Sequence, residues 1–154
     1  MHKILAFLVS AVLSVSANAG DVWGSLMTVS HHSDRSQKYN EFNPGLGLEL
    51  PTPFDSVRLV AGRYKNSYSV MSNYAGVTVM PLAIGNDVTG QVKAGMLLSG
   101  VTGYAYTGKK VAPMVAGVMT FERAGNGFNV LAVPPGFHDE NPTWIFALQL
   151  KHRF

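Results

Sequence analysis

The alternation of side chains in the last eleven residues constrains the fold more than any other feature of this chain. Successive side chains of a β-strand point to opposite faces. In an extended conformation one face carries Trp144, Phe146, Leu148, Leu150 and Phe154, and the other carries Ile145, Ala147, Gln149, Lys151 and Arg153. The first face suits hydrocarbon and the second, from Gln149 onward, suits water. A transmembrane β-strand needs about 9–11 tilted residues, so the pattern predicts one here. The alternative is an amphipathic strand of a soluble sandwich.

The N-terminal segment predicts export. Lys3 precedes an apolar run, residues 4–13, that is too short to span a bilayer as a helix. Ala17-Asn18-Ala19 has the small-residue pattern of a signal-peptide cleavage site. We therefore expect residues 1–19 to be a cleaved signal peptide and residues 20–154 to form one mature domain. The aromatic Phe154 after an amphipathic strand also resembles the terminal signal of bacterial outer-membrane barrels.

Composition narrows the function classes. The chain has no cysteine, so no disulfide stabilises the exported fold. A closed sheet, in which every strand edge is paired, is another source of stability. Twelve Lys and Arg against nine Asp and Glu give a small positive excess without a basic block, which argues against a nucleic-acid partner. Three converging metal ligands and nucleotide-binding motifs are not visible, so we expect no metal and no cofactor.

Turn-forming residues divide the mature chain into eight extended runs. The runs cover residues 22–31, 43–50, 57–66, 72–80, 88–100, 110–122, 127–133 and 143–154. Bacterial outer-membrane barrels of this size have short periplasmic turns and longer external loops. We therefore predict an all-β fold, an eight-stranded antiparallel up-and-down transmembrane β-barrel. Residues 33–42, 67–71, 101–109 and 134–142 are expected at the external end, and 51–56, 81–87 and 123–126 at the periplasmic end.

The interior and the rims of such a barrel lead to two further expectations. An eight-stranded barrel is filled by side chains or holds one small ligand. Small pairs such as Ala94-Gly95, Ser99-Gly100 and Ala116-Gly117 are compatible with both, and the residues alone favour a filled interior. The aromatic girdles at the two membrane interfaces are predicted to include Trp23, Tyr74, Phe121, Trp144 and Phe146.

Two histidines and a serine have catalytic potential. His31 and His32 lie at the end of the first run and Ser67 follows the third, so this topology brings them to one rim. A serine hydroxyl is a weak nucleophile until a base takes its proton, and a third group usually orients that base. Asn66, Asp34 and Glu41 are candidates for the third group. Neighbours in a strand face opposite sides, so only one histidine faces the site. The competing interpretation of Asn66-Ser67 is an ordinary turn.

Several short motifs resemble one family. Tyr39-Asn40-Glu41, Asn43-Pro44-Gly45-Leu46-Gly47-Leu48, Tyr64-Lys65-Asn66-Ser67-Tyr68, Tyr74-Ala75-Gly76 and Met80-Pro81-Leu82 occur in an order and spacing similar to PagP, the outer-membrane lipid A palmitoyltransferase family. The similarity continues through Val101-Thr102-Gly103, Ala112-Pro113-Met114 and Val133-Pro134-Pro135-Gly136 and covers most of the mature chain. In that family an eight-stranded barrel holds an acyl chain in its lumen. A His, an Asp and a Ser at the outer rim transfer palmitate from a phospholipid to lipid A.

Carried over by position, the resemblance implies that Ser67 is the family serine and that His31 or His32 is the histidine. Asn66 stands where the family has aspartate, and an asparagine cannot stabilise an imidazolium electrostatically. Pro113 and Pro135 resemble the family's gaps through which lipid enters the lumen.

The resemblance implies a monomer in the bacterial outer membrane whose partners are phospholipid and lipid A. It leaves two main functions open. The first is acyl transfer, and the second is a non-enzymatic barrel whose external loops bind a partner or modify the cell surface. A soluble lipocalin-like barrel is a third alternative.

Overall fold

The computed structural model describes residues 21–34, 38–104, 110–136 and 143–154. These residues form eight β-strands in one closed antiparallel barrel, in which the last strand returns to pair with the first. No helix in these ranges is long and apolar enough to cross a membrane. The predicted signal peptide, residues 1–19, lies outside the described residues, so its cleavage stays a prediction.

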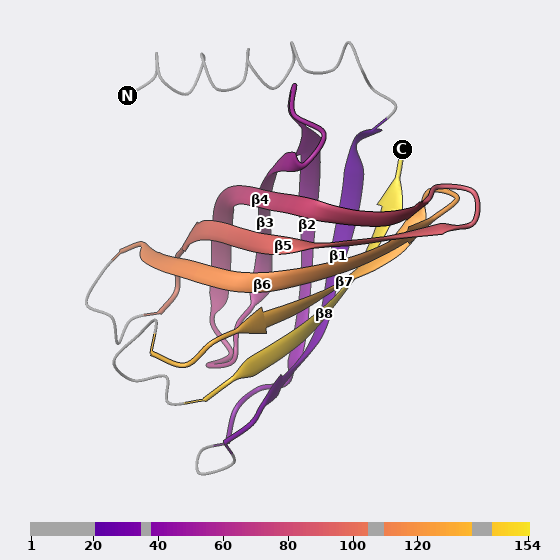
Figure 1. Cartoon of the computed structure of the whole chain (residues 1–154). Coiled ribbons are helices and arrows are strands. Elements are labelled where there is room, and N and C mark those ends of the chain that lie inside the picture. The colour runs from indigo at the N-terminus through magenta and orange to yellow at the C-terminus, as the bar shows by residue number, and fades with distance from the viewer. Residues whose placement is uncertain (1–20, 35–37, 105–109, 137–142) are drawn as a thin grey trace, which may run out of the picture.

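The strands run in alternating directions around the barrel (Figure 1). They are β1 (Trp23–His32), β2 (Phe42–Pro51), β3 (Val57–Lys65), β4 (Met71–Asn86), β5 (Gly90–Val101), β6 (Ala112–Arg123), β7 (Asn126–Val133) and β8 (Ile145–Arg153). The C-terminus lies beside the start of β1, where the Phe154 N–H donates to the Val22 carbonyl at 3.0 Å. Each strand pairs on both sides, so closure supplies the stabilisation that disulfides would otherwise give.

The predicted runs agree with seven of the strands to within two residues at each end, and β4 is the exception. The sequence predicts a turn over residues 81–87 because Pro81 cannot donate to a ladder. Instead β4 continues to Asn86 and the turn is at residues 87–89, so this prediction is wrong. The register of β4 against β5 shifts between Val79 and Leu82, which places Pro81 in a β-bulge. A bulge leaves a residue unpaired, so the missing N–H is tolerated there.

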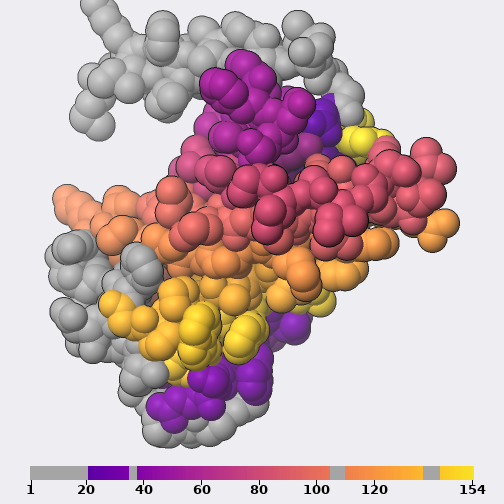
Figure 2. Space-filling view, in the orientation of Figure 1, coloured from indigo at the N-terminus to yellow at the C-terminus, as the bar shows by residue number. Residues whose placement is uncertain are grey.

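The connections gather at the two ends of the barrel. Residues 33–41, 66–70, 102–111 and 134–144 link strands at one end, which we call the loop end. Residues 52–56, 87–89 and 124–125 link them at the other, the turn end, where β1 begins and β8 finishes. The tips of the β4–β5 hairpin and of the β6–β7 turn protrude together at the right of Figure 2. The connections share ends as predicted, with the turn at residues 87–89 in place of 81–87. The side of a membrane that each end faces stays a prediction.

The outer wall is apolar. Exposed apolar side chains on it include Leu26, Leu46, Leu59, Met96, Met119 and Leu150. Among the described strand residues, the charged Lys and Arg side chains that alternate onto this wall are Arg63, Lys65 and Arg123, each within three residues of a strand end. The alternation predicted for β8 is confirmed, because Phe146 and Leu150 are exposed whereas Gln149 and Lys151 are buried.

Two of the predicted girdle residues lie inside the barrel. Trp23 and Tyr74 are buried, so their assignment to a girdle is wrong. Lys151 Nζ lies 4.5 Å from the centroid of the Trp23 ring, and Gln149 Nε2 donates to the Tyr74 hydroxyl at 3.5 Å. Lys151 and Gln149 lie on the inner face of the barrel. The aromatic character of Trp23 and Tyr74 alone does not tell which face they occupy. Trp144 and Phe146 do lie on the outer wall, with ring centroids 6.2 Å apart.

Candidate lumenal site

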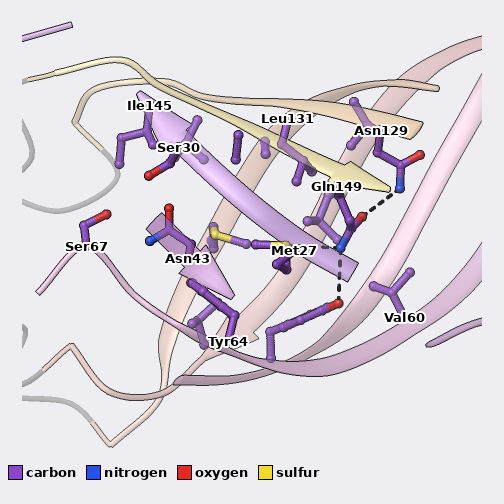
Figure 3. A pocket seen from close by; sticks show the side chains of 18 of the residues that line it. Met27, Ser30, Asn43, Val60, Tyr64, Ser67, Asn129, Leu131, Ile145 and Gln149 are labelled. Carbon is purple, nitrogen blue, oxygen red and sulfur yellow. Dashed lines mark hydrogen bonds between the residues drawn. The ribbon is translucent and has the colours of Figure 1, made fainter. Parts of the chain in front are cut away.

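An apolar pocket occupies the lumen toward the loop end (Figure 3). Its wall includes Met27, Val60, Leu97, Val118, Leu131 and Ala147, which come from six different strands. The cavity measures about 110 Å³ and reaches from Ser67 and Tyr104 down to Glu49 and Gln149. The expectation of a filled interior is therefore wrong for this part of the lumen. Small inward side chains, such as Ser25 and Ala116, leave the space open.

Buried charges and amides fill the lumen below the pocket. Lys151 Nζ lies 3.0 Å from Glu49 Oε2 and 2.7 Å from Glu122 Oε1, and Lys93 Nζ lies 2.7 Å from Glu122 Oε2. The Asn129 carboxamide donates to Glu49 Oε1 at 2.8 Å and to Gln149 Oε1 at 2.7 Å. Two ammonium groups thus balance two carboxylates, which is the condition for burying charge at tolerable cost. We call Glu49, Lys93, Glu122, Asn129, Gln149 and Lys151 the polar plug.

The structure separates the two candidate histidines. His32 is 1% exposed and lines the pocket, with its ring stacked on Tyr39 at a centroid distance of 4.0 Å. The His31 side chain is 56% exposed on the outer wall, where its Nδ1 lies 3.5 Å from Glu41 Oε1. The same Glu41 oxygen accepts the His32 backbone N–H at 3.2 Å. Of the two, His32 is the one placed to reach a ligand in the lumen, and its role as a base stays a prediction.

Ser67 lines the same pocket from the loop that follows β3 (Figure 3). Its carbonyl accepts the Asn40 N–H at 2.8 Å, and the Asn40 side chain donates to the Asn66 and Phe42 carbonyls at 3.1 and 2.7 Å. These bonds hold the β3–β4 loop against the start of β2. The structure therefore brings Ser67 and His32, which are far apart in the sequence, to one pocket.

Asn66 has a different position. Its fully buried side chain donates to Ser72 Oγ and to the Gly103 carbonyl, both at 3.0 Å, and accepts the Tyr68 and Val70 N–H groups at 2.9 and 3.0 Å. Four bonds use the full capacity of a carboxamide. None of the four goes to a histidine. Asn66 therefore shapes the turn, in agreement with the competing interpretation of the Asn66-Ser67 pair.

Tyrosines surround the pocket at the loop end, although the sequence did not predict them as site residues. The Tyr64 and Tyr104 hydroxyls lie 2.9 Å apart, and Tyr68 contacts Tyr39 and Tyr104 edge to face at centroid distances of 6.1 and 6.2 Å. Burial raises the pKa of the Tyr104 phenol, so its hydroxyl stays protonated and can donate a hydrogen bond. These tyrosines lie on separate strands and loops, so no local sequence motif predicts that they form a cluster.

The ladder between β6 and β7 is incomplete beside the pocket. It begins at Gly117 and Ala132, whereas residues 112–116 of β6 pair with β5 alone. Met114 and Ala116 of this stretch line the pocket, and Pro113 lacks the N–H that a longer ladder would use. Pro135 follows the end of β7. Entry of lipid through this gap stays a prediction.

Among the described residues, no three His, Cys, Asp or Glu side chains gather to hold a metal ion. Comparisons with protein-family models and with curated proteins find no match to this chain. The geometry itself defines a class of molecule, a closed eight-stranded barrel with a polar plug toward the turn end and an apolar lumenal pocket toward the loop end.

Proposed function

We propose that this protein is an outer-membrane barrel that takes one acyl chain of a phospholipid into its lumen and transfers that chain to lipid A. The pocket carries the proposal, because it joins an apolar interior to Ser67 and His32 at the loop end. Each methylene buried there contributes about 0.8 kcal/mol, so a chain that fills the pocket is held without any charged contact. The incomplete β6–β7 ladder offers a lateral route from the bilayer.

The outer wall supports a membrane location. Apolar side chains cover it, the outward Lys and Arg lie near strand ends, and Trp144 stacks with Phe146 beside the loop end. Outer-membrane barrels have this arrangement, an apolar band with aromatic side chains at its margins. Export by the predicted signal peptide is a requirement of the same proposal.

The chemistry follows from a serine and an imidazole in one pocket. Ser67 Oγ attacks the ester carbonyl of the phospholipid while His32 takes the hydroxyl proton. The ester C–O bond breaks, and His32 returns the proton to the departing lysophospholipid. A hydroxyl of lipid A then attacks the acyl-serine and gives its proton to His32. The bond between the acyl carbon and Ser67 Oγ breaks, and His32 returns the proton to Oγ, which restores the Ser67 hydroxyl. Such general acid–base assistance is worth roughly 10²–10⁴-fold in rate.

Mass spectrometry of lipid A from expressing cells tests the proposal. Cells that make the wild-type protein or the His31→Ala variant should gain lipid A with one added acyl chain. Cells that make Ser67→Ala or His32→Ala should not, although both variants should still fold as heat-modifiable barrels in the outer-membrane fraction. His31→Ala is the matched control because that side chain lies on the outer wall. Unmodified lipid A with a folded wild-type barrel and phospholipid present would reject acyl transfer.

The second candidate function is a non-enzymatic barrel that binds lipid or a surface partner. The contacts of Asn66 favour it, because the residue at the position of the family aspartate is committed to the turn. Binding of a lipid chain by purified wild-type protein, together with unmodified lipid A, would select this function.

A further inference from the structure

Two buried polar atoms in the pocket wall have no hydrogen-bond partner among the described residues, and the proposed acyl transfer does not use them. Ser30 Oγ and Asn43 Oδ1 accept or donate no hydrogen bond within the described structure, although their residues are only 9% and 3% exposed. Both residues line the lumenal pocket, and in Figure 3 Asn43 lies between Ser67 and Met27 while Ser30 is drawn above Asn43. Burying a polar atom without a partner is unfavourable, so the pair indicates a ligand group that satisfies it.

Asn43 can offer this ligand an acceptor and nothing else. Its Nδ2 donates to the Asn40 carbonyl at 3.3 Å and to the Lys65 carbonyl at 3.0 Å. Because both partners are carbonyl oxygens, the amide cannot be turned over, and Oδ1 is the atom left for the lumen. A ligand satisfies Oδ1 only by donating a hydrogen bond to it.

Ser30 lies next to this acceptor on the neighbouring strand. Val29 pairs with Phe42, and the Ser30 N–H donates to the Glu41 carbonyl at 2.9 Å, so Ser30 and Asn43 are diagonal neighbours across β1 and β2. The serine hydroxyl donates as well as accepts. Together the two side chains match a ligand group that both donates and accepts a hydrogen bond, which is the property of a hydroxyl.

We propose that Ser30 and Asn43 form a subsite that selects a single-chain lipid with a hydroxyl at the polar end of its chain. The ligand hydroxyl donates to Asn43 Oδ1 and accepts from Ser30 Oγ, while the chain fills the apolar pocket. An ester or ether oxygen cannot donate and leaves Asn43 Oδ1 unsatisfied. The inference rests on chain binding in the lumen, as in the proposed function, and is independent of acyl transfer.

A pair of probes that differ by one donor tests the subsite. We would measure displacement of a fluorescent polyene fatty acid from the full-length mature barrel in nanodiscs by 1-tetradecanol and by its methyl ether. The wild-type protein should bind the alcohol roughly tenfold more tightly than the ether, as a site built to bind a hydroxyl does. Ser30→Ala and Asn43→Leu should each reduce this ratio toward one. Ser30→Ala removes no backbone or loop hydrogen bond, so it remains informative where Asn43→Leu fails to fold.

Thr78→Val is the matched control. Thr78 also lines the pocket, and its buried hydroxyl has no hydrogen-bond partner among the described residues, but it lies on β4, away from Asn43. The alcohol-to-ether ratio should survive this change. Equal affinities in the wild type, or a ratio that Ser30→Ala leaves intact and Thr78→Val abolishes, would overturn the subsite while leaving the lumenal site in place. Failure of both probes and of the fatty acid to bind would overturn the lumenal site itself.

Discussion

At the scale of single residues, a β-bulge decides which histidine faces the lumen. Strict alternation from Trp23, Ser25 and Met27 would turn His31 inward. The register of β1 shifts between Met27 and Val29, so the inner face continues through Ser30 and His32 instead. The sequence predicted that the two histidines face opposite sides, and this is confirmed. It could not predict which one faces inward, because nothing in the residues marks the bulge.

A substitution at Asn66 separates its turn-forming role from a catalytic one. Asn66→Asp should lower the free energy of unfolding by about 1–3 kcal/mol, because a carboxylate cannot donate to Ser72 Oγ or to the Gly103 carbonyl. Urea unfolding in lipid vesicles measures the change. Asn86→Asp is the control, since Asn86 Oδ1 only accepts, from Val88, Thr89 N–H and Thr89 Oγ1. A variant as stable as the control and faster in acyl transfer would contradict the turn-forming role.

At the scale of the strands, periodicity predicted the faces of β8 correctly, whereas turn-forming residues placed the end of β4 wrongly. The two faces of β8 follow from alternation alone, and burial confirms them. The end of β4 does not follow from the sequence pattern. Pro81 is typical of a turn, but in the barrel it lies in a β-bulge and the strand continues past it. The true turn is set by Asn86, whose side chain accepts the Val88 and Thr89 N–H groups.

An arginine scan of β8 tests the proposed lipid contact. Leu148 alternates onto the outer wall near the middle of the strand, so Leu148→Arg should cost about 2–4 kcal/mol of unfolding free energy if that wall faces hydrocarbon. His152→Arg lies near the strand end and should cost about 0–1 kcal/mol. Unfolding titrations of both variants in vesicles give the comparison. Equal small costs would indicate that the wall faces water and would favour the soluble lipocalin-like alternative.

At the scale of the whole molecule, the lumen is divided into a polar part and an apolar part. The plug charges Glu49, Lys93, Glu122 and Lys151 come from β2, β5, β6 and β8 and are distant in the sequence. They meet only when the barrel closes with this register, so neither the plug nor the pocket above it could be predicted from local patterns. The closed eight-stranded architecture could be predicted from local patterns, because most strands show alternating side chains and are bounded by turn-forming residues.

Substitutions in the polar plug test whether its paired charges stabilise the barrel. Lys151→Met should lower the unfolding free energy by about 3–5 kcal/mol, because it leaves the buried Glu49 carboxylate without its cation and Glu122 with one of two. Arg153→Met removes a partly exposed pair with Asp87 and a contact of the guanidinium with the Trp23 ring, 5.6 Å from its centroid, and should cost about 1–2 kcal/mol. Adding Glu49→Gln to Lys151→Met should recover part of the loss, since the unpaired charge is then removed. If the double variant is less stable than Lys151→Met, the loss comes from packing against Trp23 rather than from an uncompensated charge.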